Sequence, residues 1–424
     1  MKRLGFVLAG LALLAVLVFG WLWRLSEAGA DAVQAQAPVA TADATTLVAR
    51  GAYLAKAGNC ALCHTVRGGP AYAGGRAIDT PFGTLYTSNL TPAQRTGLGK
   101  WTAQDFWRAL HHGRSRDGRM LYPAFPYTNY TRVTRDDSDA LFAYLQSLPP
   151  VERDNLAHTL SWPVRTQAAL AVWRALYFRP GAQPADAAQT PEWNRGAYLV
   201  QGLGHCSACH SARDALGGSN LMDLSGGMIP MQNWYAPSLA SRTEAGVADW
   251  SVADIVQLLR TGRAGPASAL GPMAEVVLHS TQHLSEADLR AMAVFLKAIP
   301  QTEVAAKAPT TARVVSERGA RVYGEQCAQC HGERGQGVPG AYPPLAGNRA
   351  VLLPQTANLV QAVIHGGFPP ATEGNPRPFG MPPFAVMLDD ADVAAVLTYI
   401  RNAWGQSAGP VSELDVARQR GSRP

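Results

Sequence analysis

Three copies of one five-residue pattern contain all six cysteines of the chain and point to a single chemistry. The pattern is Cys-x-x-Cys-His, and it occurs at residues 60–64, 206–210 and 327–331. In such a pattern the two thiols form thioethers with a haem, and the adjoining histidine becomes the proximal ligand of the iron. A redox dithiol or half of a zinc site does not require a histidine beside every copy. We therefore expect three covalent c-type haems. The predicted attachment and proximal residues are Cys60, Cys63, His64, Cys206, Cys209, His210, Cys327, Cys330 and His331.

The second protein ligand of each iron is expected later in the same repeat. Methionine is favoured because its thioether is a soft ligand that suits haem iron. In the first repeat, Met120 is the only histidine or methionine between residues 113 and 134. In the second repeat, Met273 competes with His279 and His283.

In the third repeat, Met381 precedes two prolines, and Met387 is the alternative ligand. An iron with two protein ligands has no position for a substrate and only exchanges electrons. The sequence also lacks a nucleophile–base pair, a phosphate loop and a dinucleotide fingerprint, so we expect a chain that is not an enzyme by itself. The predicted iron ligands are His64, Met120, His210, Met273, His331 and Met381.

Three segments recur in each repeat and predict the helices that position these residues. The first contains Arg-Gly-Ala, the second has apolar residues at helical spacing before a glycine, and the third is amphipathic with Asp or Ser near its start. They are residues 50–54, 101–110 and 135–145 in the first repeat, 195–199, 250–259 and 284–296 in the second, and 318–320, 358–364 and 388–400 in the third. Strand patterns are scarce. We therefore expect an all-α fold of three tandem cytochrome c-type domains.

Changes in composition set the expected domain boundaries. Segments rich in Pro, Ala and Gln separate the repeats at residues 180–191 and 300–311. The expected parts are a membrane anchor or signal peptide (1–27), a flexible tether (28–47), the first domain (48–155), a connecting helix and linker (156–192), the second domain (193–300), a linker (301–313), the third domain (314–405) and a polar, solvated tail (406–424).

The N-terminal segment predicts export. Lys2 and Arg3 precede an uncharged run from Leu4 to Trp23, and a helix of this length covers ~30 Å, the thickness of the hydrocarbon core of a bilayer. A cleaved signal peptide is the alternative, because residues 28–30 and 35–37 both resemble cleavage sites. Either alternative places the rest of the chain outside the cytoplasm.

Composition and one further segment bear on partners. The formal net charge of +6 comes without a run of basic residues, so no nucleic acid is expected to bind.

Residues 160–178 are rich in Trp and Leu and predict a helix with an apolar face at Ala169, Val172, Trp173 and Leu176. This face is expected either to lie on the membrane or a partner protein, or to pack between the first two domains.

The chain resembles the triple-haem cytochrome c subunits of bacterial membrane-bound periplasmic dehydrogenases, such as those for alcohol, gluconate, sorbitol and aldehyde. The resemblance runs from about Thr46 to Gly405 and includes residues 87–92, 121–127, 234–237, 271–277, 380–384 and 399–405. It implies a subunit on the periplasmic side of the inner membrane. Such a subunit takes electrons from a quinone-, flavin- or molybdenum-dependent catalytic subunit and passes them to ubiquinone or a terminal oxidase. The resemblance also supports Met273 and Met381 as ligands.

One position departs from the pattern of this family. Alcohol and polyol members have methionine within Tyr-Pro-Ala-x-Pro-Tyr, where this chain has Phe125, which cannot ligate iron. Met120, five residues earlier, is then the substitute ligand. The phenylalanine form is similar to subunits that serve molybdenum hydroxylases acting on aldehydes or N-heterocycles. If Met120 does not ligate, the first haem is open, and a haem enzyme of peroxidase or reductase type is the alternative function.

Overall fold

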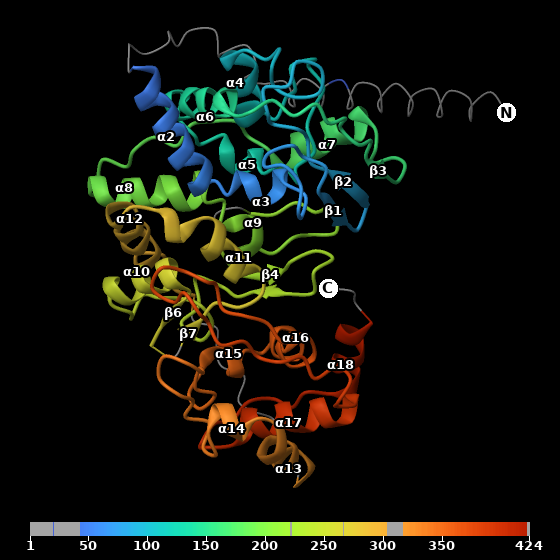
Figure 1. The fold of residues 1–424 in the computed structure, drawn as a ribbon, viewed down its shortest axis with the longest axis vertical. Coiled ribbons are helices and arrows are strands. Elements are labelled where there is room, and N and C mark those ends of the chain that lie inside the picture. The colour runs from blue at the N-terminus through green and yellow to red at the C-terminus, as the bar shows by residue number, and fades with distance from the viewer. Residues whose placement is uncertain (1–19, 21–42, 221–222, 266, 303–316, 422–424) are drawn as a thin grey trace, which may run out of the picture. The chain divides into compact units, whose positions relative to one another are not determined.

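The computed structural model describes residue 20 and residues 43–220, 223–265, 267–302 and 317–421 (Figure 1). The predicted anchor or signal peptide lies outside these ranges except for Gly20, as do most of the tether and of the second linker. No helix within the described ranges is long and apolar enough to cross a bilayer. The described chain is mainly helical with a few short strands, which confirms the predicted class in outline.

Contacts divide the chain into two compact units. The first contains residues 1–185, 201–205 and 213–221, and the second contains residues 186–200, 206–212 and 222–424. The second and third repeats share the second unit. Within it, the Asn358 side chain exchanges two hydrogen bonds of 2.8 Å with the main chain of Tyr235, and Arg349 lies 2.9 Å from Asp249.

The first unit contains a helical repeat and one small antiparallel sheet. Strand β1 (Ala77–Thr80) pairs with β2 (Gly83–Tyr86), which pairs with β3 (Thr159–Leu160), so that Ile78 faces Leu85 and Gly83 faces Leu160. The helices are α2 (Ala44–Ala57), α3 (Cys60–His64), α4 (Ala103–His112), α5 (Tyr127–Tyr130), α6 (Arg135–Ser147) and α7 (Gln167–Tyr177).

The second unit contains the helices of the other two repeats. Those of the second repeat are α8 (Pro191–Tyr198), the π-helix η2 (Leu199–Leu203), part of which belongs to the first unit, α9 (Ser207–His210), α10 (Val252–Thr261), α11 (Pro272–His279), the 3₁₀-helix η3 (Thr281–His283) and α12 (Glu286–Lys297). Two strand pairs accompany them, β4 (Gly227–Met228) with β5 (Tyr235–Ala236), and β6 (Arg263–Ala264) with β7 (Ala267–Ser268). The third repeat has α13 (Glu317–Gln326), α14 (Ala328–His331), α15 (Arg349–Leu352), α16 (Ala357–His365), α17 (Asp390–Asn402) and α18 (Glu413–Arg420). All nine predicted helical segments are confirmed.

The recurring Arg-Gly-Ala segment is explained by a helix crossing that each repeat contains. Helix α2 packs on α6, α8 on α12, and α13 on α17 (Figure 1). At each crossing a Cβ added to the glycine would collide with a main-chain carbonyl oxygen of the other helix; the pairs are Gly51 with Ala140, Gly196 with Ala291, and Gly319 with Ala395. Only glycine allows so close an approach.

The arginine before each of these glycines ties the same two helices together. Its Nε donates to an aspartate on the last helix, at 2.8 Å from Arg50 to Asp137, 2.8 Å from Arg195 to Asp288 and 2.7 Å from Arg318 to Asp392. A buried carboxylate needs such a partner, and Asp137 is only 2% exposed. The Arg-Gly pair therefore fixes the frame that holds each haem motif.

The predicted glycine stops of the middle helices are also confirmed. Gly113, Gly262 and Gly366 follow α4, α10 and α16 with φ of 58°, 76° and 63°. These values lie in the left-handed region, where a side chain would be strained. Each stop releases the chain into the loop that carries a predicted methionine ligand.

Helix α7 confirms that residues 160–178 contain a helix. Its buried residues are Leu170, Ala171, Arg174 and Ala175, which pack into the first unit. On the face predicted to make contacts, Leu176 is 54% exposed, whereas Trp173 is half-buried and donates through Nε1 to the carbonyl of Leu216 at 3.0 Å. The contact of this face with a membrane, a partner or the second domain stays a prediction.

The C-terminal segment corrects the prediction of a solvated tail. Residues 413–420 form α18, which packs on α16 and α17 in the second unit. Val411 is 5% exposed and Val416 is fully buried. Two buried valines in a mostly polar segment give too weak a pattern for sequence analysis, but they are enough to anchor one short helix.

Candidate haem sites

Each Cys-x-x-Cys-His motif ends on a short helix that follows the first helix of its repeat, and the first cysteine lies within that helix or just before it. The helices are α3, α9 and α14. All six cysteines lie in described residues, and none of them forms a disulfide. Burial raises the pKa of Cys60 and Cys206 to about 12 and that of Cys327 to about 11. Because no disulfide occupies them, the two thiols of each motif are available beside a histidine, as haem attachment requires.

The three motif histidines share one hydrogen bond that sequence analysis did not predict. The Nδ1 atom of His64 donates to the carbonyl of Ser88 at 2.7 Å. His210 donates in the same way to Pro237 at 2.7 Å, and His331 donates to Pro343 at 3.0 Å. Three separate loops thus supply the same acceptor to the same ring atom.

This bond prepares each histidine as an iron ligand. A proton on Nδ1 leaves the lone pair of Nε2 free for a metal, and the carbonyl fixes the orientation of the ring. Burial lowers the pKa of all three imidazoles, against a smaller opposing effect of the carbonyl bond. The rings are therefore neutral near pH 7, which is the form that ligates metal.

In the second repeat, one segment connects the histidine side with the predicted methionine side. Residues 234–237 begin with Trp234, whose ring lies against Gly271, and end with Pro237, the acceptor of His210. Gly271 immediately precedes α11, in which Met273 is the second residue. The competing His279 lies on the same helix with its Nε2 3.2 Å from a carboxylate oxygen of Glu275. Met273 is thus the candidate that the structure joins most directly to the motif.

In the third repeat, Met381 lies on the core and Met387 on the surface. Met381 packs against the same buried cluster as Cys327, a cluster that includes Val322, Tyr323 and Ile364. Its main chain pairs with Gly367, with hydrogen bonds of 2.8 and 3.0 Å. Met387 is 63% exposed. These positions favour Met381 over Met387 as the ligand.

In the first repeat, Met120 occupies the main-chain position of Met381 but has different neighbours. Met120 pairs with Arg114 just as Met381 pairs with Gly367, in each case the residue after the helix-ending glycine. Its side chain is 2% exposed and packs with Leu170 and Ala171 of α7. The Gln167 side chain bonds both the amide and the carbonyl of Met120, at 2.7 and 3.2 Å.

Phe125, in contrast, lies close to the haem motif of the first repeat. Its ring centre is 5.4 Å from that of Tyr130, and the Tyr130 hydroxyl donates to the carbonyl of Gly58, two residues before Cys60. In the second repeat, the strand partner of Arg263 is Ser268, and Met273 follows Ser268 by five residues, as Phe125 follows Met120. Phe125 therefore corresponds in position to Met273.

The residues present fit covalent haem in each repeat. The donor set consists of two thiols and an imidazole whose Nε2 is free, with an apolar core beside it and a methionine later in the same repeat. Sequence analysis found the donors but missed the acceptor carbonyls of Ser88, Pro237 and Pro343. Main-chain carbonyls have no sequence signature, although residues 87–92 and 234–237 are among the segments that carry the family resemblance.

Comparisons with known proteins agree with these sites. The cytochrome c family model matches residues 48–149 and 316–404. The chain is 39% identical over 420 residues to the cytochrome c subunit of a quinone-dependent alcohol dehydrogenase from Gluconobacter oxydans, with 94% of this chain and 87% of the relative covered. It is 38% identical to the gluconate 2-dehydrogenase cytochrome c subunit of Pantoea cypripedii, with 88% and 89% covered.

A third relative is longer. The chain is 41% identical over 367 residues to one of the subunits of nicotinate dehydrogenase from Pseudomonas putida, and the match covers 84% of this chain but only 30% of that protein.

Proposed function

Because the chain belongs to the family of cytochrome c subunits of bacterial dehydrogenases, we propose that it carries three covalent c-type haems and relays electrons between a catalytic subunit and a respiratory acceptor. The single observation that carries this proposal is the shared bond from each motif histidine to a main-chain carbonyl. Three repeats with the same cysteine pair and the same oriented imidazole, each followed by a methionine, support three haem sites.

Each repeat supplies what a haem needs to act as an electron carrier. When bound, haem iron cycles between two oxidation states, and ligation by histidine and methionine raises its reduction potential. The proposed ligand pairs are His64 with Met120, His210 with Met273, and His331 with Met381. The chain itself then orients the imidazoles and keeps them neutral.

We propose a periplasmic location and a molybdenum-dependent partner. Phe125 within the Tyr-Pro-Ala-x-Pro-Tyr segment supports this choice, and so does the 41% identity to a subunit of nicotinate dehydrogenase, whose substrate is an N-heterocycle. A quinone- or flavin-dependent partner is the alternative. On either alternative ubiquinone or a terminal oxidase receives the electrons.

The haem count tests the first part of the proposal. The purified protein should keep three haems per chain after denaturation in acid and organic solvent, because thioethers survive where coordinate bonds do not. Cys206→Ala with Cys209→Ala should leave two haems, and it serves as the internal standard for counting. Release of haem on denaturation, or a ratio other than three, contradicts the proposal.

Carbon monoxide distinguishes an electron carrier from a haem enzyme. If every iron has two protein ligands, the reduced protein should show no spectral change under carbon monoxide. A change that corresponds to one third of the haem would identify an open first haem and favour a peroxidase or reductase function. Co-purification of a stoichiometric molybdenum-containing subunit would establish the partner, whereas a quinone- or flavin-containing subunit would overturn that choice.

A further inference from the structure

The strongest feature that the function does not yet use is the attachment of α18 to the loop that carries Met381. The helix begins at the N-cap Ser412, whose side chain exchanges hydrogen bonds with Asp415, and it is anchored by the buried Val416. The first repeat also continues into a helix after its last shared helix, but that helix, α7, contacts Met120 itself and not a turn after it.

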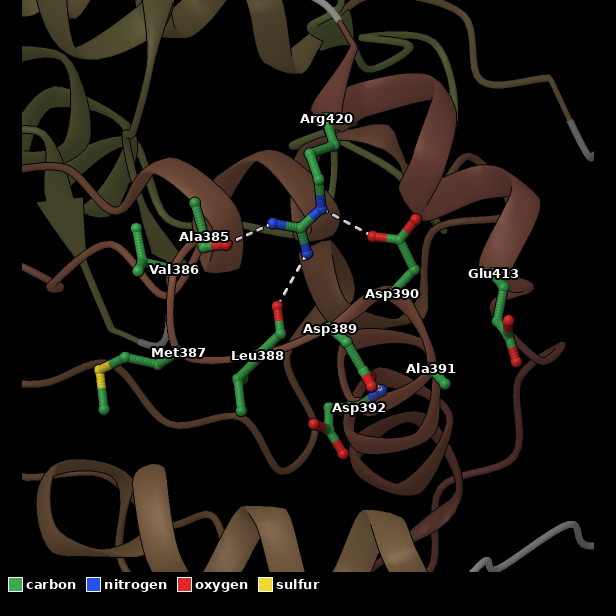
Figure 2. Close-up of a pocket in the computed structure, with 10 residues that line it drawn as sticks. All are labelled: Ala385, Val386, Met387, Leu388, Asp389, Asp390, Ala391, Asp392, Glu413 and Arg420. Carbon is green, nitrogen blue, oxygen red and sulfur yellow. Dashed lines mark hydrogen bonds and ion pairs between the residues drawn. The ribbon is translucent and has the colours of Figure 1, made fainter.

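Arg420, the last residue of α18, makes three interactions with the chain just after the methionine segment. Its guanidinium donates to the carbonyl of Ala385 at 2.5 Å and to the carbonyl of Leu388 at 2.9 Å, and its Nε lies 2.7 Å from a carboxylate oxygen of Asp390. Figure 2 shows the guanidinium reaching these three groups across the pocket lined by residues 385–392, Glu413 and Arg420.

The turn that Arg420 holds is tied to the loop of Met381. The amides of Phe384 and Ala385 donate to the carbonyls of Val363 and Ile364 at the end of α16, at 3.0 and 3.2 Å. Met381 itself pairs with Gly367, two residues after the same helix. The segment from Met381 to Leu388 is therefore fastened at its start to the chain after α16 and at its end to Arg420.

A second contact attaches α18 to α16 directly. The Gln361 amide donates to Gln419 at 3.0 Å. Helix α18 thus bonds both the helix before the methionine loop and the turn after it. The ion pair alone would contribute little, since the Arg420 and Asp390 side chains are 30% and 32% exposed. We call the three interactions of Arg420 with Ala385, Leu388 and Asp390 the clamp. The two charge-assisted bonds to carbonyls are its stronger part.

We propose that Arg420 is a positioning residue for the third haem: by holding the turn at residues 385–388, it keeps the Met381 thioether in place against displacement. This inference rests on the proposed function, because it takes Met381 to be an iron ligand. It predicts that loss of Arg420 loosens one iron–sulfur bond of three and leaves the other two unchanged.

The test uses the full-length, haem-loaded protein and the far-red charge-transfer band of the bond between methionine sulfur and ferric iron. Cyanide is added, and the loss of this band is followed over time. In Arg420→Ala, one third of the band should disappear about tenfold faster than in the unchanged protein, which corresponds to ~1.4 kcal/mol. Arg420→Lys, which keeps the charge but not the forked geometry, should fall between the two.

Two matched variants separate the clamp from a general effect of α18. Arg418→Ala removes an arginine from the same helix that is 67% exposed and makes only a 3.9 Å contact with Asp415, so it should match the unchanged protein. Asp390→Asn removes the ion pair but keeps both carbonyl bonds, so it should change the rate by less than about twofold.

The outcomes distinguish a failure of the clamp from a failure of the ligand. If Met381→Ala removes one third of the band but Arg420→Ala reacts with cyanide like Arg418→Ala, the clamp is overturned and the ligand stands. If Met381→Ala leaves the band unchanged, the proposed ligand is overturned and the clamp with it. If Arg420→Ala does not fold, the comparison of Arg420→Lys with Arg418→Ala decides the same question.

Discussion

The first and third repeats hold the proximal histidine in the same way but the methionine segment in different ways. His64 and His331 each donate Nδ1–H to a main-chain carbonyl. On the methionine side, Gln167 of α7 bonds the main chain of Met120 itself, with a neutral side chain. In the third repeat, Arg420 of α18 bonds the turn after Met381, with a charged one.

This difference shows which parts of the repeat are fixed and which are adjustable. The crossing of the first and last helices and the histidine–carbonyl bond recur in all three repeats. Helices α7 and α18 do not recur, and each is joined to the methionine side of its own repeat. The residues proposed to attach haem therefore lie in the common frame, whereas the methionine segments of the first and third repeats are each held by an added helix.

The environment of Met120 indicates which of the two proposed iron–sulfur bonds is the weaker. Its side chain already packs in a buried cluster with Leu170 and Ala171, so ligation would have to compete with this packing. Met381 is only partly buried and packs on the core cluster that also borders Cys327. We therefore expect the iron–sulfur bond of the first haem to be weaker than that of the third.

Removing the two methionines one at a time gives the largest expected effect. Met381→Ala should lower the reduction potential of one haem by about 0.1–0.3 V, because thioether ligation favours reduced iron. Met120→Ala should lower a potential by less but cost about 2–5 kcal/mol of stability, because it also leaves a cavity beside α7. Spectroelectrochemical titration and thermal unfolding measure the two quantities.

A third methionine provides the control. Met292 is 4% exposed in α12 and lies outside every predicted ligand window. Met292→Ala should therefore destabilise the protein without moving any potential. If Met120→Ala behaves like Met292→Ala, then Met120 is a packing residue and the first iron lacks a methionine ligand.

The helix crossings should respond equally in the two repeats, because they belong to the common frame. Gly51→Ala and Gly319→Ala each place a methyl group against a carbonyl oxygen of the facing helix, and each should destabilise its unit by about 1–3 kcal/mol. Gly324→Ala is the matched control, since an added Cβ there meets nothing within 4 Å. It should be neutral or stabilise α13 by up to ~1 kcal/mol. Denaturant unfolding followed by circular dichroism measures all three, and unequal effects at Gly51 and Gly319 would argue against a shared frame.

The helices and the glycine stops of the common frame are the part that sequence analysis predicted well, because each repeats three times and one copy supports the others. The contacts that join these elements, such as Gly51 with Ala140 and His64 with Ser88, link residues far apart in sequence and were not predicted. The added helices were harder to predict. Gln167 and Arg420 act through main-chain carbonyls and amides far away in sequence, and neither has a counterpart in another repeat. Residues 406–424 were expected to be solvated because the two valines that anchor α18 stand among polar neighbours.

Breaking the neutral clamp of the first repeat should have a smaller effect. Gln167→Ala removes two hydrogen bonds to Met120 and should cost about 1–2 kcal/mol. It should also speed cyanide binding at the first haem without changing the third. Leu176→Ala on the exposed face of the same helix is the control and should stay within about 0.5 kcal/mol. Equal cyanide rates in the two variants would show that α7 does not hold the methionine segment.

The smallest expected effect concerns the caps of the last helices, which differ between the repeats in their response to acid. Helix α6 begins at Thr134, which does not titrate, whereas α17 begins at Asp389. The amide of Asp392 donates to Asp389 at 2.7 Å, and this bond, together with the nearby Arg318, lowers the pKa of the Asp389 carboxyl. A carboxyl whose pKa is lower in the folded state stabilises that state above its unfolded pKa, and this contribution is lost as the pH falls through the folded value.

Acid unfolding of the second unit should therefore depend slightly on Asp389, and that of the first unit should not depend on Thr134. Asp389→Asn keeps an N-cap acceptor but removes the titration, so the acid midpoint of the second unit should shift by about 0.2–0.5 pH unit. Thr134→Ser, the control in the first unit, should leave its midpoint unchanged. Circular dichroism between neutral pH and pH 2 measures both midpoints. If the acid midpoint of Asp389→Asn equals that of the unchanged protein, the charge of Asp389 adds nothing to the cap of α17. The N-caps of α6 and α17 would then respond to acid in the same way.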